Sequence, residues 1–251
     1  MEKLRKRKKP VMERTKVVKD KYLPYGLHWI DEDDIQEVVK VLRSDWITQG
    51  PKVKEFEEKL ANYCEAKYAV AVSSGTAALH LACHVLRVRP GDEIITSPIT
   101  FLATSNSVLY CGGKPIFVDI DEKTYNIDVN KIEKKINKNT KGIIPVDFAG
   151  QPCDLDGIRE IANKYHLWIM EDAAHALGAE YNGKKIGGLS DLTIFSFHPV
   201  KAITTGEGGA IATNNRTLYE RLLMLRSHGV TKDSSKFETK NEKSKGGQWY
   251  Y

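Results

Sequence analysis

The feature that most constrains the fold is an alternation of short apolar runs with helical patterns, beginning near residue 68. Seven runs that read as buried strands occur at 68–73, 93–97, 115–120, 142–147, 167–171, 192–197 and 209–213. One intervening segment, 154–166, shows a single apolar helical face made of Leu155, Ile158, Ile161, Ala162 and Tyr165. Strands that are apolar almost throughout, separated by helices, indicate a parallel sheet covered on both faces. The sequence therefore predicts an α/β protein with a seven-stranded, mostly parallel sheet.

Two more helices are predicted before the first strand. The first begins near Asp31 and repeats apolar residues at Ile35, Val38, Val39 and Leu42, and the second repeats them at Val53, Phe56, Leu60 and Tyr63. The loop between them contains Asp45, Trp46, Ile47 and Thr48, followed by Gly50 and Pro51. Trp46 in this loop is either a packing residue or an aromatic side chain that stacks on a ligand.

Positive charge is concentrated at the start of the chain. Residues 1–21 hold ten Lys and Arg against three acids, a net charge of +7, which leaves −2 for the other 230 residues of a chain with a total of +5. Residues 1–24 are predicted to be a disordered extension, with a basic arm for acidic polymers or lipid as the alternative. The polar run from Lys232 to Gly247 predicts a mobile loop, so the expected domain is 25–231. Because that body is near neutral, no nucleic-acid partner is predicted.

No membrane segment or secretory leader is predicted. An apolar segment does not follow the early positive charges, and 18 consecutive apolar residues occur nowhere. The cysteines Cys64, Cys83, Cys111 and Cys153 lack C-x-x-C spacing, which argues against a zinc site or a disulfide framework. A cytoplasmic protein with reduced thiols and no metal site fits these observations.

The candidate reactive group is Lys201, which follows the run 192–197 by four residues. Ser196 and His198 precede it, and the glycine-rich stretch Gly206–Gly209 follows. Ligands of α/β sheets bind beyond the carboxyl ends of the strands. A desolvated lysine amine there loses its proton and condenses with a carbonyl group. The alternative is an ordinary surface lysine.

A candidate anion site follows the first strand, at Ser73-Ser74-Gly75-Thr76. A helix that begins at this turn presents free backbone N–H groups and the positive end of its dipole. Gly75 permits close backbone approach, and Thr76 adds a hydroxyl group. The glycine spacings of nucleoside triphosphate and dinucleotide sites are absent. An ordinary capped helix remains the alternative.

Acids and a histidine follow the fifth run, at Glu171, Asp172 and His175. A carboxylate desolvated at a strand's carboxyl end needs a positive partner. Asp172 could equally cap the next segment, and His175 could equally be a hydrogen-bonded core residue. A phosphate, a protonated ring nitrogen and an aldehyde are what pyridoxal phosphate offers to the anion turn, the acid and the lysine.

Several ordered motifs resemble the DegT/StrS-type sugar aminotransferases, a family that uses pyridoxal phosphate. They are SSGTAALHLA, SPITFLATSNSVLYCGGKPIFVDID, VDFAGQPCDLDGI, EDAAHALGAEYNGKKIGGLSD and FSFHPVKAITTGEGGAI. The resemblance covers nearly everything from Tyr25 to Tyr251. It implies the large domain of the aspartate-aminotransferase-like fold (fold type I), with the small C-terminal domain missing or truncated, and a homodimer for the full-length protein.

The resemblance also implies roles for individual residues. Lys201 forms the covalent link to the cofactor, Asp172 pairs with the ring nitrogen and Phe101 stacks on the ring. Gly75, Thr76 and Ser196 bind the phosphate, and His175 lies near the polar edge of the ring. In the most similar subgroup, the residues matching Tyr25 and Asp45, Trp46, Ile47 and Thr48 touch the nucleotide sugar.

That subgroup makes UDP-linked 4-amino-4,6-dideoxy-N-acetylhexosamines for surface polysaccharides and glycans. The implied reaction transfers the amino group of L-glutamate to the 4-keto group of a UDP-linked 6-deoxy sugar. Rival interpretations are a sister dehydratase, which typically has histidine in place of Lys201, and a non-catalytic protein that keeps the fold. Two departures bear on this: Ala202 stands where many relatives have asparagine, and relatives continue past Tyr251. The chain is therefore expected to be an N-terminal portion.

Overall fold

The structure is a computed structural model that describes residues 26–230. The predicted basic extension 1–24, Tyr25 and the predicted loop 232–251 therefore lie outside the described residues. All seven predicted strands of the main sheet lie within them, with bounds that differ from the prediction by a few residues. They are β1 (Tyr68–Val72), β2 (Glu93–Thr96), β3 (Lys114–Phe117), β4 (Thr140–Ile144), β5 (Trp168–Asp172), β8 (Leu192–Ser196) and β9 (Gly209–Thr213).

The strand order is β1-β9-β8-β5-β4-β2-β3, and a single strand runs against the others. Strand β9 pairs antiparallel with both β1 and β8, whereas the remaining pairs are parallel. Since β1 and β8 both oppose β9, they run in the same direction as each other. The carboxyl ends of β1, β8, β5, β4, β2 and β3 therefore meet at one edge of the sheet, which confirms the prediction of a mostly parallel sheet.

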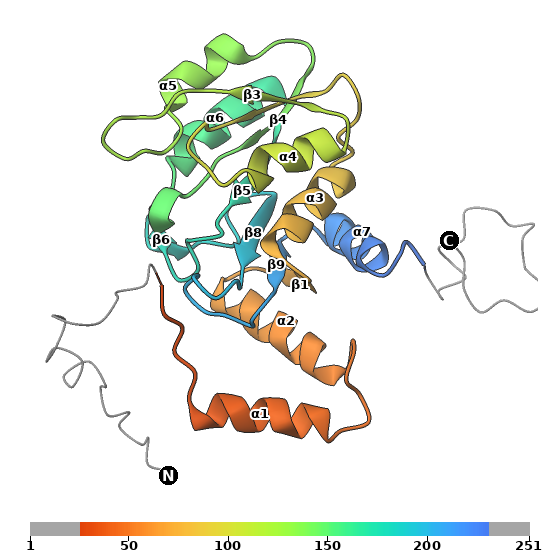
Figure 1. The fold of residues 1–251 in the computed structure, drawn as a ribbon. Coiled ribbons are helices and arrows are strands. Elements are labelled where there is room, and N and C mark those ends of the chain that lie inside the picture. The colour runs from red at the N-terminus through yellow and green to blue at the C-terminus, as the bar shows by residue number, and fades with distance from the viewer. Residues whose placement is uncertain (1–25, 231–251) are drawn as a thin grey trace, which may run out of the picture.

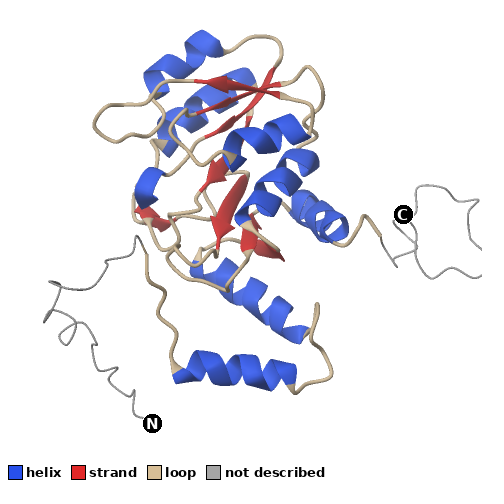
Figure 2. Cartoon of the chain, viewed as in Figure 1, coloured by secondary structure: helices blue, strands red, loops and turns tan. Residues whose placement is uncertain are grey.

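The helices cover both faces of this sheet, as Figures 1 and 2 show. The α-helices are α1 (Glu32–Leu42), α2 (Pro51–Tyr63), α3 (Gly75–Val85), α4 (Ala103–Tyr110), α5 (Val129–Ile132), α6 (Leu155–Tyr165) and α7 (Arg216–Arg226). Short 3-10 turns occupy η2 (Glu133–Lys135) and η3 (Phe148–Gly150). Helices α2, α5 and α6 contribute to the core on one face, and α3, α4 and α7 to the core on the other.

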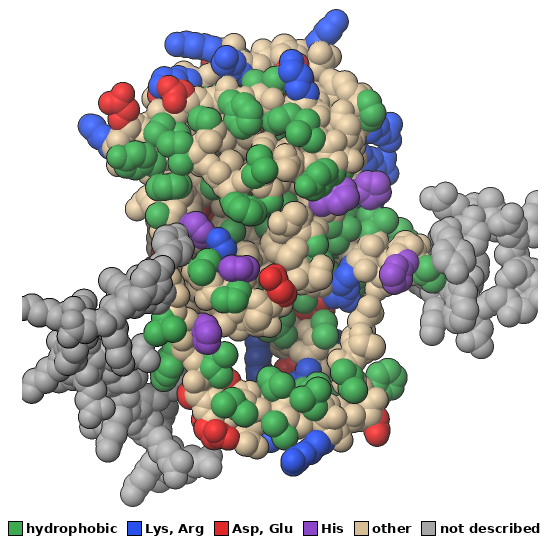
Figure 3. Space-filling model, in the orientation of Figure 1, with side chains coloured by type: hydrophobic (Ala, Val, Ile, Leu, Met, Phe, Trp, Pro, Cys, Tyr) green, Lys and Arg blue, Asp and Glu red, His purple; other side chains and the backbone are tan. Residues whose placement is uncertain are grey.

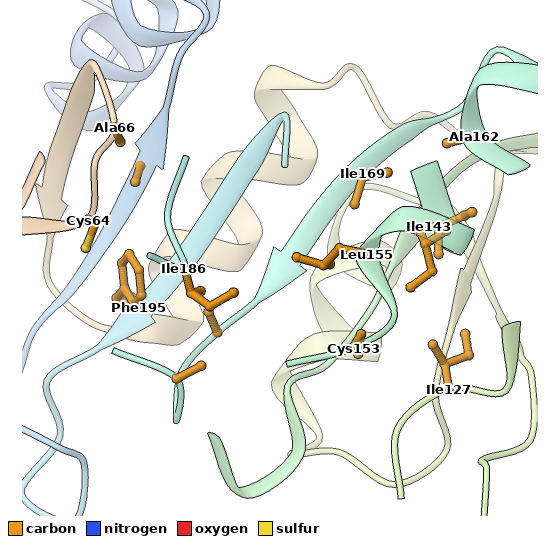
Figure 4. Close-up of a cluster of buried hydrophobic side chains, with 14 of the residues drawn as sticks. Cys64, Ala66, Ile127, Ile143, Cys153, Leu155, Ala162, Ile169, Ile186 and Phe195 are labelled. Carbon is orange, nitrogen blue, oxygen red and sulfur yellow. The ribbon is translucent and has the colours of Figure 1, made fainter. Parts of the chain in front are cut away.

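Alternation along the strands explains why there are two cores. Ile143, Ile169 and Phe195 point into the core on the α6 side, drawn in Figure 4, while the next residues Ile144 and Met170 and the preceding Ile194 point into the core on the α3 side. Successive side chains of a strand face opposite sides of a sheet. A strand that is buried on both sides therefore needs an apolar residue at nearly every position.

Helix α1 differs from the other long helices because none of its residues is buried. It begins as predicted, with the side chain of Asp31 accepting hydrogen bonds from the N–H groups of Asp33 and Asp34. The apolar positions Ile35, Val38 and Leu42 are nevertheless exposed. Figure 3 shows exposed hydrophobic side chains along this part of the molecule. The helical spacing was predicted correctly, but no described residue covers this face.

A two-stranded hairpin between β5 and β8 was not predicted. It pairs β6 (Glu180–Tyr181) with β7 (Lys184–Lys185) across Asn182 and Gly183. Both turn residues have positive φ, which is the conformation that favours an Asn-Gly dipeptide in a tight hairpin. Among residues 26–230, no helix has the length and apolar character that crossing a bilayer requires.

Candidate active site

A cavity of about 560 Å³ lies at the edge where the parallel strands end. It is lined by all seven residues predicted to bind the cofactor: Gly75, Thr76, Phe101, Asp172, His175, Ser196 and Lys201. They come from segments far apart in the sequence, after β1, before α4, at the ends of β5 and β8, and in the loop that follows β8. Their convergence follows from the strand directions, because β1, β5 and β8 all end at this edge.

The start of α3 forms the anion-binding part of the cavity. Ser74 caps the helix by accepting a hydrogen bond from the N–H of Ala77 at 3.0 Å. Among the described residues, no hydrogen bond takes the N–H groups of Gly75 or Thr76. Ser196 lies so close that a Cβ added to Gly75 would be 2.9 Å from its Cβ. Two free amides and two hydroxyl groups, at the positive end of the helix dipole, suit a phosphate.

Asp172 lies on the floor of the cavity and is almost fully buried, with 5% of its surface exposed. Its Oδ2 accepts a hydrogen bond from the hydroxyl of Thr104 at 2.6 Å, and its Oδ1 accepts one from the N–H of Ala174 at 3.3 Å. Burial raises the pKa of this carboxyl, while these two hydrogen bonds and the nearby charge of Lys201 oppose the shift. A cation at the open side of the cavity would stabilise the ionised form.

Lys201 and His175 contact each other directly, with Nζ 2.6 Å from Nε2. Burial lowers the pKa of Lys201, and the charge of Asp172 opposes that change. Burial also lowers the pKa of His175, and the charge of Lys201 lowers it further. The site therefore favours an uncharged imidazole beside an amine that gives up its proton more readily than a surface lysine.

Phe101 is an aromatic ring on the cavity wall with 76% of its surface exposed. It precedes α4, whose first residue Ala103 also lines the cavity. An exposed aromatic ring beside polar groups offers a flat face for a planar ligand. The position agrees with the stacking role that the family resemblance implies, which remains a prediction.

The predicted substrate-binding residues that the structure describes do not line this cavity. Asp45, Trp46, Ile47 and Thr48 lie in the loop between α1 and α2, where Trp46 and Ile47 are 65% and 70% exposed. Thr48 instead lines a second cavity of about 870 Å³, with residues of β1, α3 and the end of α7. Tyr25 lies outside the described residues. The next residue, Gly26, is close to Val200, because a Cβ added to Gly26 would be 3.3 Å from that of Val200.

Sequence reasoning missed other residues of the cavity. Asp147, His198 and Glu207 also line the cavity. The hydroxyl of Thr104 donates a hydrogen bond to Asp172. Asp147 ends the predicted run 142–147, so the rule that placed Asp172 at a strand end could have found it. No local pattern marks Thr104, because its role depends on a hydrogen bond to Asp172, which lies 68 residues later in the chain.

Three relatives share most of this chain. It is 48% identical over 235 residues to the uncharacterized protein MJ1066 of Methanocaldococcus jannaschii, covering 94% of this chain and 60% of that protein. It is 45% identical over 213 residues to the UDP-4-amino-4,6-dideoxy-N-acetyl-beta-L-altrosamine transaminase of Campylobacter jejuni, covering 84% and 56%. It is 44% identical over 220 residues to the UDP-4-amino-4-deoxy-L-arabinose–oxoglutarate aminotransferase of Shewanella sediminis, covering 88% and 56%. The chain thus spans little more than half of the curated relatives it matches.

The fold is that of solved aminotransferases. The structure superposes on PseC of Helicobacter pylori, an aminotransferase involved in the biosynthesis of pseudoaminic acid, with a TM-score of 0.80. The two are 39% identical, over 84% of this chain and 57% of PseC. Residues 28–247 match the model of one protein family, whose aminotransferases depend on pyridoxal phosphate. The chain belongs to the DegT/DnrJ/EryC1/StrS aminotransferase family.

Proposed function

We propose that the protein to which this chain belongs is a pyridoxal-phosphate-dependent transaminase. It transfers the amino group of L-glutamate to the 4-keto group of a UDP-linked 4-keto-6-deoxy-N-acetylhexosamine, for a surface polysaccharide or glycan. The observation that carries the proposal is the contact between Lys201 and His175 in the cavity that also contains Asp172 and the free amides of α3. A lysine at this position speaks against the sister dehydratases.

The groups around the cavity fit pyridoxal phosphate. The free N–H groups of Gly75 and Thr76 and the hydroxyl of Ser196 suit its phosphate, and the close approach of Gly75 to Ser196 leaves no room there for a larger side chain. The buried carboxyl of Asp172 suits a protonated ring nitrogen, and Lys201 suits the aldehyde. When bound, pyridoxal phosphate supplies an aldehyde that exchanges amines and a ring that takes up electrons.

The residues of the chain then have separate tasks. Lys201, whose pKa is lowered by burial, would hold the cofactor through its Nζ, and the same amine would serve as a general base and acid that moves protons at Nζ. Asp172, oriented by Thr104, keeps a proton on the ring nitrogen. His175 orients the amine of Lys201 through its Nε2. The start of α3 would hold the phosphate of the cofactor through the N–H groups of Gly75 and Thr76.

The choice of substrates follows the relatives. The Campylobacter jejuni relative is named for a UDP-linked altrosamine, and the Shewanella sediminis relative is named for a UDP-linked arabinose and oxoglutarate. An oxoglutarate product pairs with glutamate as the donor, which supports L-glutamate here. We assign Tyr25 and the loop 45–48 to the nucleotide sugar on the family resemblance.

We also infer a homodimer and a cytoplasmic location. The exposed apolar residues Ile35, Val38 and Leu42 of α1 support a partner surface, since exposed apolar patches mark interaction sites. The cysteines Cys64, Cys83, Cys111 and Cys153 are free, which supports a reducing compartment.

Absorbance spectroscopy of the purified chain with pyridoxal phosphate tests the proposal. We expect a visible band from the covalent link to Lys201, and loss of this band on adding L-glutamate. When the UDP-linked keto sugar is then added, mass spectrometry should detect an aminated sugar nucleotide. A band that forms but does not respond to any amino acid would favour the non-catalytic alternative. No band at all would contradict the proposed function.

A further inference from the structure

Two carboxyl groups that the proposed mechanism does not use are buried beneath the candidate active site. Asp147 follows β4 and is 1% exposed, and Glu171 lies in β5 and is fully buried. Asp147 also lines the cavity that contains Lys201. A carboxylate withdrawn from water is costly unless a cation or several hydrogen-bond donors compensate it. The partners of these two groups therefore decide their protonation.

Each carboxyl has one oxygen with a donor and one oxygen without. Asp147 Oδ1 accepts a hydrogen bond from the N–H of Cys153 at 3.0 Å, and Glu171 Oε2 accepts one from the hydroxyl of Thr193 at 3.1 Å. The other oxygens, Asp147 Oδ2 and Glu171 Oε1, are buried and have no donor among the described residues. Strands β4 and β5 pair in parallel, and Val146 lies opposite Asp172, so the adjacent residues Asp147 and Glu171 lie on neighbouring segments, where the charge of Glu171 acts on Asp147. A proton held between them would satisfy both remaining oxygens.

The surrounding charged groups do not replace a proton between the two carboxyls. Arg159 of α6 is the cation that acts on Glu171, but its guanidinium lies 3.5 Å from Asp191 Oδ2 and donates to the carbonyl of Leu189. The other titratable group that faces the pair is the thiol of Cys153, which donates to the carbonyl of Val146 at 3.2 Å. It supplies no positive charge.

The direction of the pKa changes agrees with this geometry. Burial raises the pKa of Asp147 well above its usual range, and the adjacent charge of Glu171 raises it further. Burial also raises the pKa of Glu171. The side chains of Ser190, Asp147 and Thr193 and the charge of Arg159 oppose that change. Two like charges so close together and so far from water cannot both form without a large cost.

We propose that Asp147 and Glu171 share one proton and that this carboxyl pair positions Asp172. The N–H of Asp147 donates to the carbonyl of Asp172 at 3.1 Å, and the N–H of Asp172 donates to the carbonyl of Pro145 at 2.9 Å. The segment that carries Asp147 thus holds both backbone polar groups of Asp172. Glu171 is the preceding residue, and its side chain points to the opposite face of the sheet. The positioning role rests on the cofactor role proposed for Asp172, whereas the shared proton does not.

The pair gives a defined dependence on pH. Because the pKa values are raised in the folded state, folding takes up a proton. The stability that this proton contributes is fully present below the unfolded pKa of the two acids, and it is lost as the pH rises through the folded pKa of the pair. Ionising both groups would place two negative charges behind Asp172 and loosen the segment that holds it.

Infrared difference spectroscopy of the full chain tests the shared proton without any cofactor. A protonated carboxyl has a C=O stretch separate from that of a carboxylate, so we expect such a band at pH 7. This band should disappear in both Asp147→Asn and Glu171→Gln. In each variant an amide replaces one carboxyl, and its N–H group takes over the hydrogen bond that the shared proton made. The band should remain in Glu160→Gln, an exposed control on α6. Asp172→Asn identifies any band that comes from Asp172. A band that persists in both pair variants, or no band in the wild type, would overturn the proposal.

The positioning role needs a second measurement, the affinity for pyridoxal phosphate from pH 6 to 9. We expect the wild type to lose affinity at high pH relative to Glu171→Gln, because an amide keeps the hydrogen bond to Asp147 and does not titrate. Glu171→Ala should bind on the order of tenfold more weakly than the wild type at pH 6, where the pair is protonated, for loss of about one hydrogen bond to a charged group. Profiles of wild type and Glu171→Gln that coincide would refute the positioning role. If no variant links to the cofactor while the infrared band behaves as expected, the proposed function fails and the shared proton stands.

Discussion

The Nζ of Lys201 lies 2.6 Å from the Nε2 of His175, so the ionisation of the two groups is linked. Two positive charges at this separation would repel each other strongly in a partly buried site. The pair therefore carries no more than one positive charge at neutral pH. A positive charge on either group is stabilised by the carboxylate of Asp172. This carboxylate raises the pKa of both Lys201 and His175, whereas burial lowers them.

Replacing Lys201 with alanine should abolish the covalent attachment of pyridoxal phosphate, because Lys201 is the one lysine among the described residues that line the cavity. Borohydride reduction followed by peptide mass spectrometry should detect the cofactor on Lys201 in the wild type and in Lys184→Ala, an exposed control. The same stable adduct found on another lysine in Lys201→Ala would contradict the assignment.

Asp172→Asn should lower the pKa of Lys201 further. The carboxylate of Asp172 is the charge that raises this pKa, so its removal leaves burial unopposed. The measurement is the rate at which an amine-directed reagent modifies Lys201 as a function of pH, without added cofactor. The midpoint should move to lower pH in Asp172→Asn and stay unchanged in Asp156→Asn, whose side chain is exposed. A midpoint that moves to higher pH would disprove the electrostatic argument.

Thr104→Val should weaken the binding of pyridoxal phosphate about tenfold. The variant keeps the shape of the side chain but removes the hydroxyl that donates to Asp172 Oδ2 at 2.6 Å, worth about 1–1.5 kcal/mol for a typical hydrogen bond. Spectroscopic titration with the cofactor measures the dissociation constant. Ser105→Ala is the matched control, since that hydroxyl donates to the carbonyl of Leu102 and does not touch Asp172. Equal effects of the two substitutions would exclude a specific role for Thr104.

Arg226→Ala should lower the free energy of unfolding by about 2 kcal/mol, because it leaves the carboxylate of Glu57 buried without its cation. Arg226 Nη1 contacts Glu57, whose side chain is only 10% exposed and also accepts a hydrogen bond from the N–H of Ala71. In contrast, Lys54→Ala breaks an exposed pair with Glu58 and should change the same quantity by less than about 0.5 kcal/mol. Urea unfolding of both variants distinguishes these values, and a loss in Lys54→Ala as large as in Arg226→Ala would reject the argument.

The sheet was largely predictable because its central strands, such as β8 and β9, are buried on both faces. Each of the seven strands contains apolar residues that mark it in the sequence, and the turn at Ser74 and Gly75 marks the start of α3. The order of the strands was not predictable from these signals. Nothing local to Gly209–Thr213 indicates that β9 lies between β1 and β8. The hairpin at Asn182 and Gly183 was missed although its dipeptide is a strong turn signal.

The candidate site was predictable where chemistry marks single residues and unpredictable where two segments meet. Lys201, Asp172 and His175 each stand at the end of a predicted strand or just after it, so their residue types were informative. The support of Asp172 by Thr104 joins positions that are 68 residues apart. The carboxyl pair of Asp147 and Glu171 likewise depends on the pairing of β4 with β5. Such contacts exist only after the sheet has formed.

The position of β9 also sets an order of assembly during synthesis. Strand β1 pairs with β9 and with no other strand of the described chain, so β1 remains without a partner until residue 213 has left the ribosome. By then the segments that supply Asp172 and Lys201 have already been made. A nascent chain that stalls before Gly209 would therefore hold the lysine and the acid, yet the strand that leads into its phosphate-binding turn would have no partner strand.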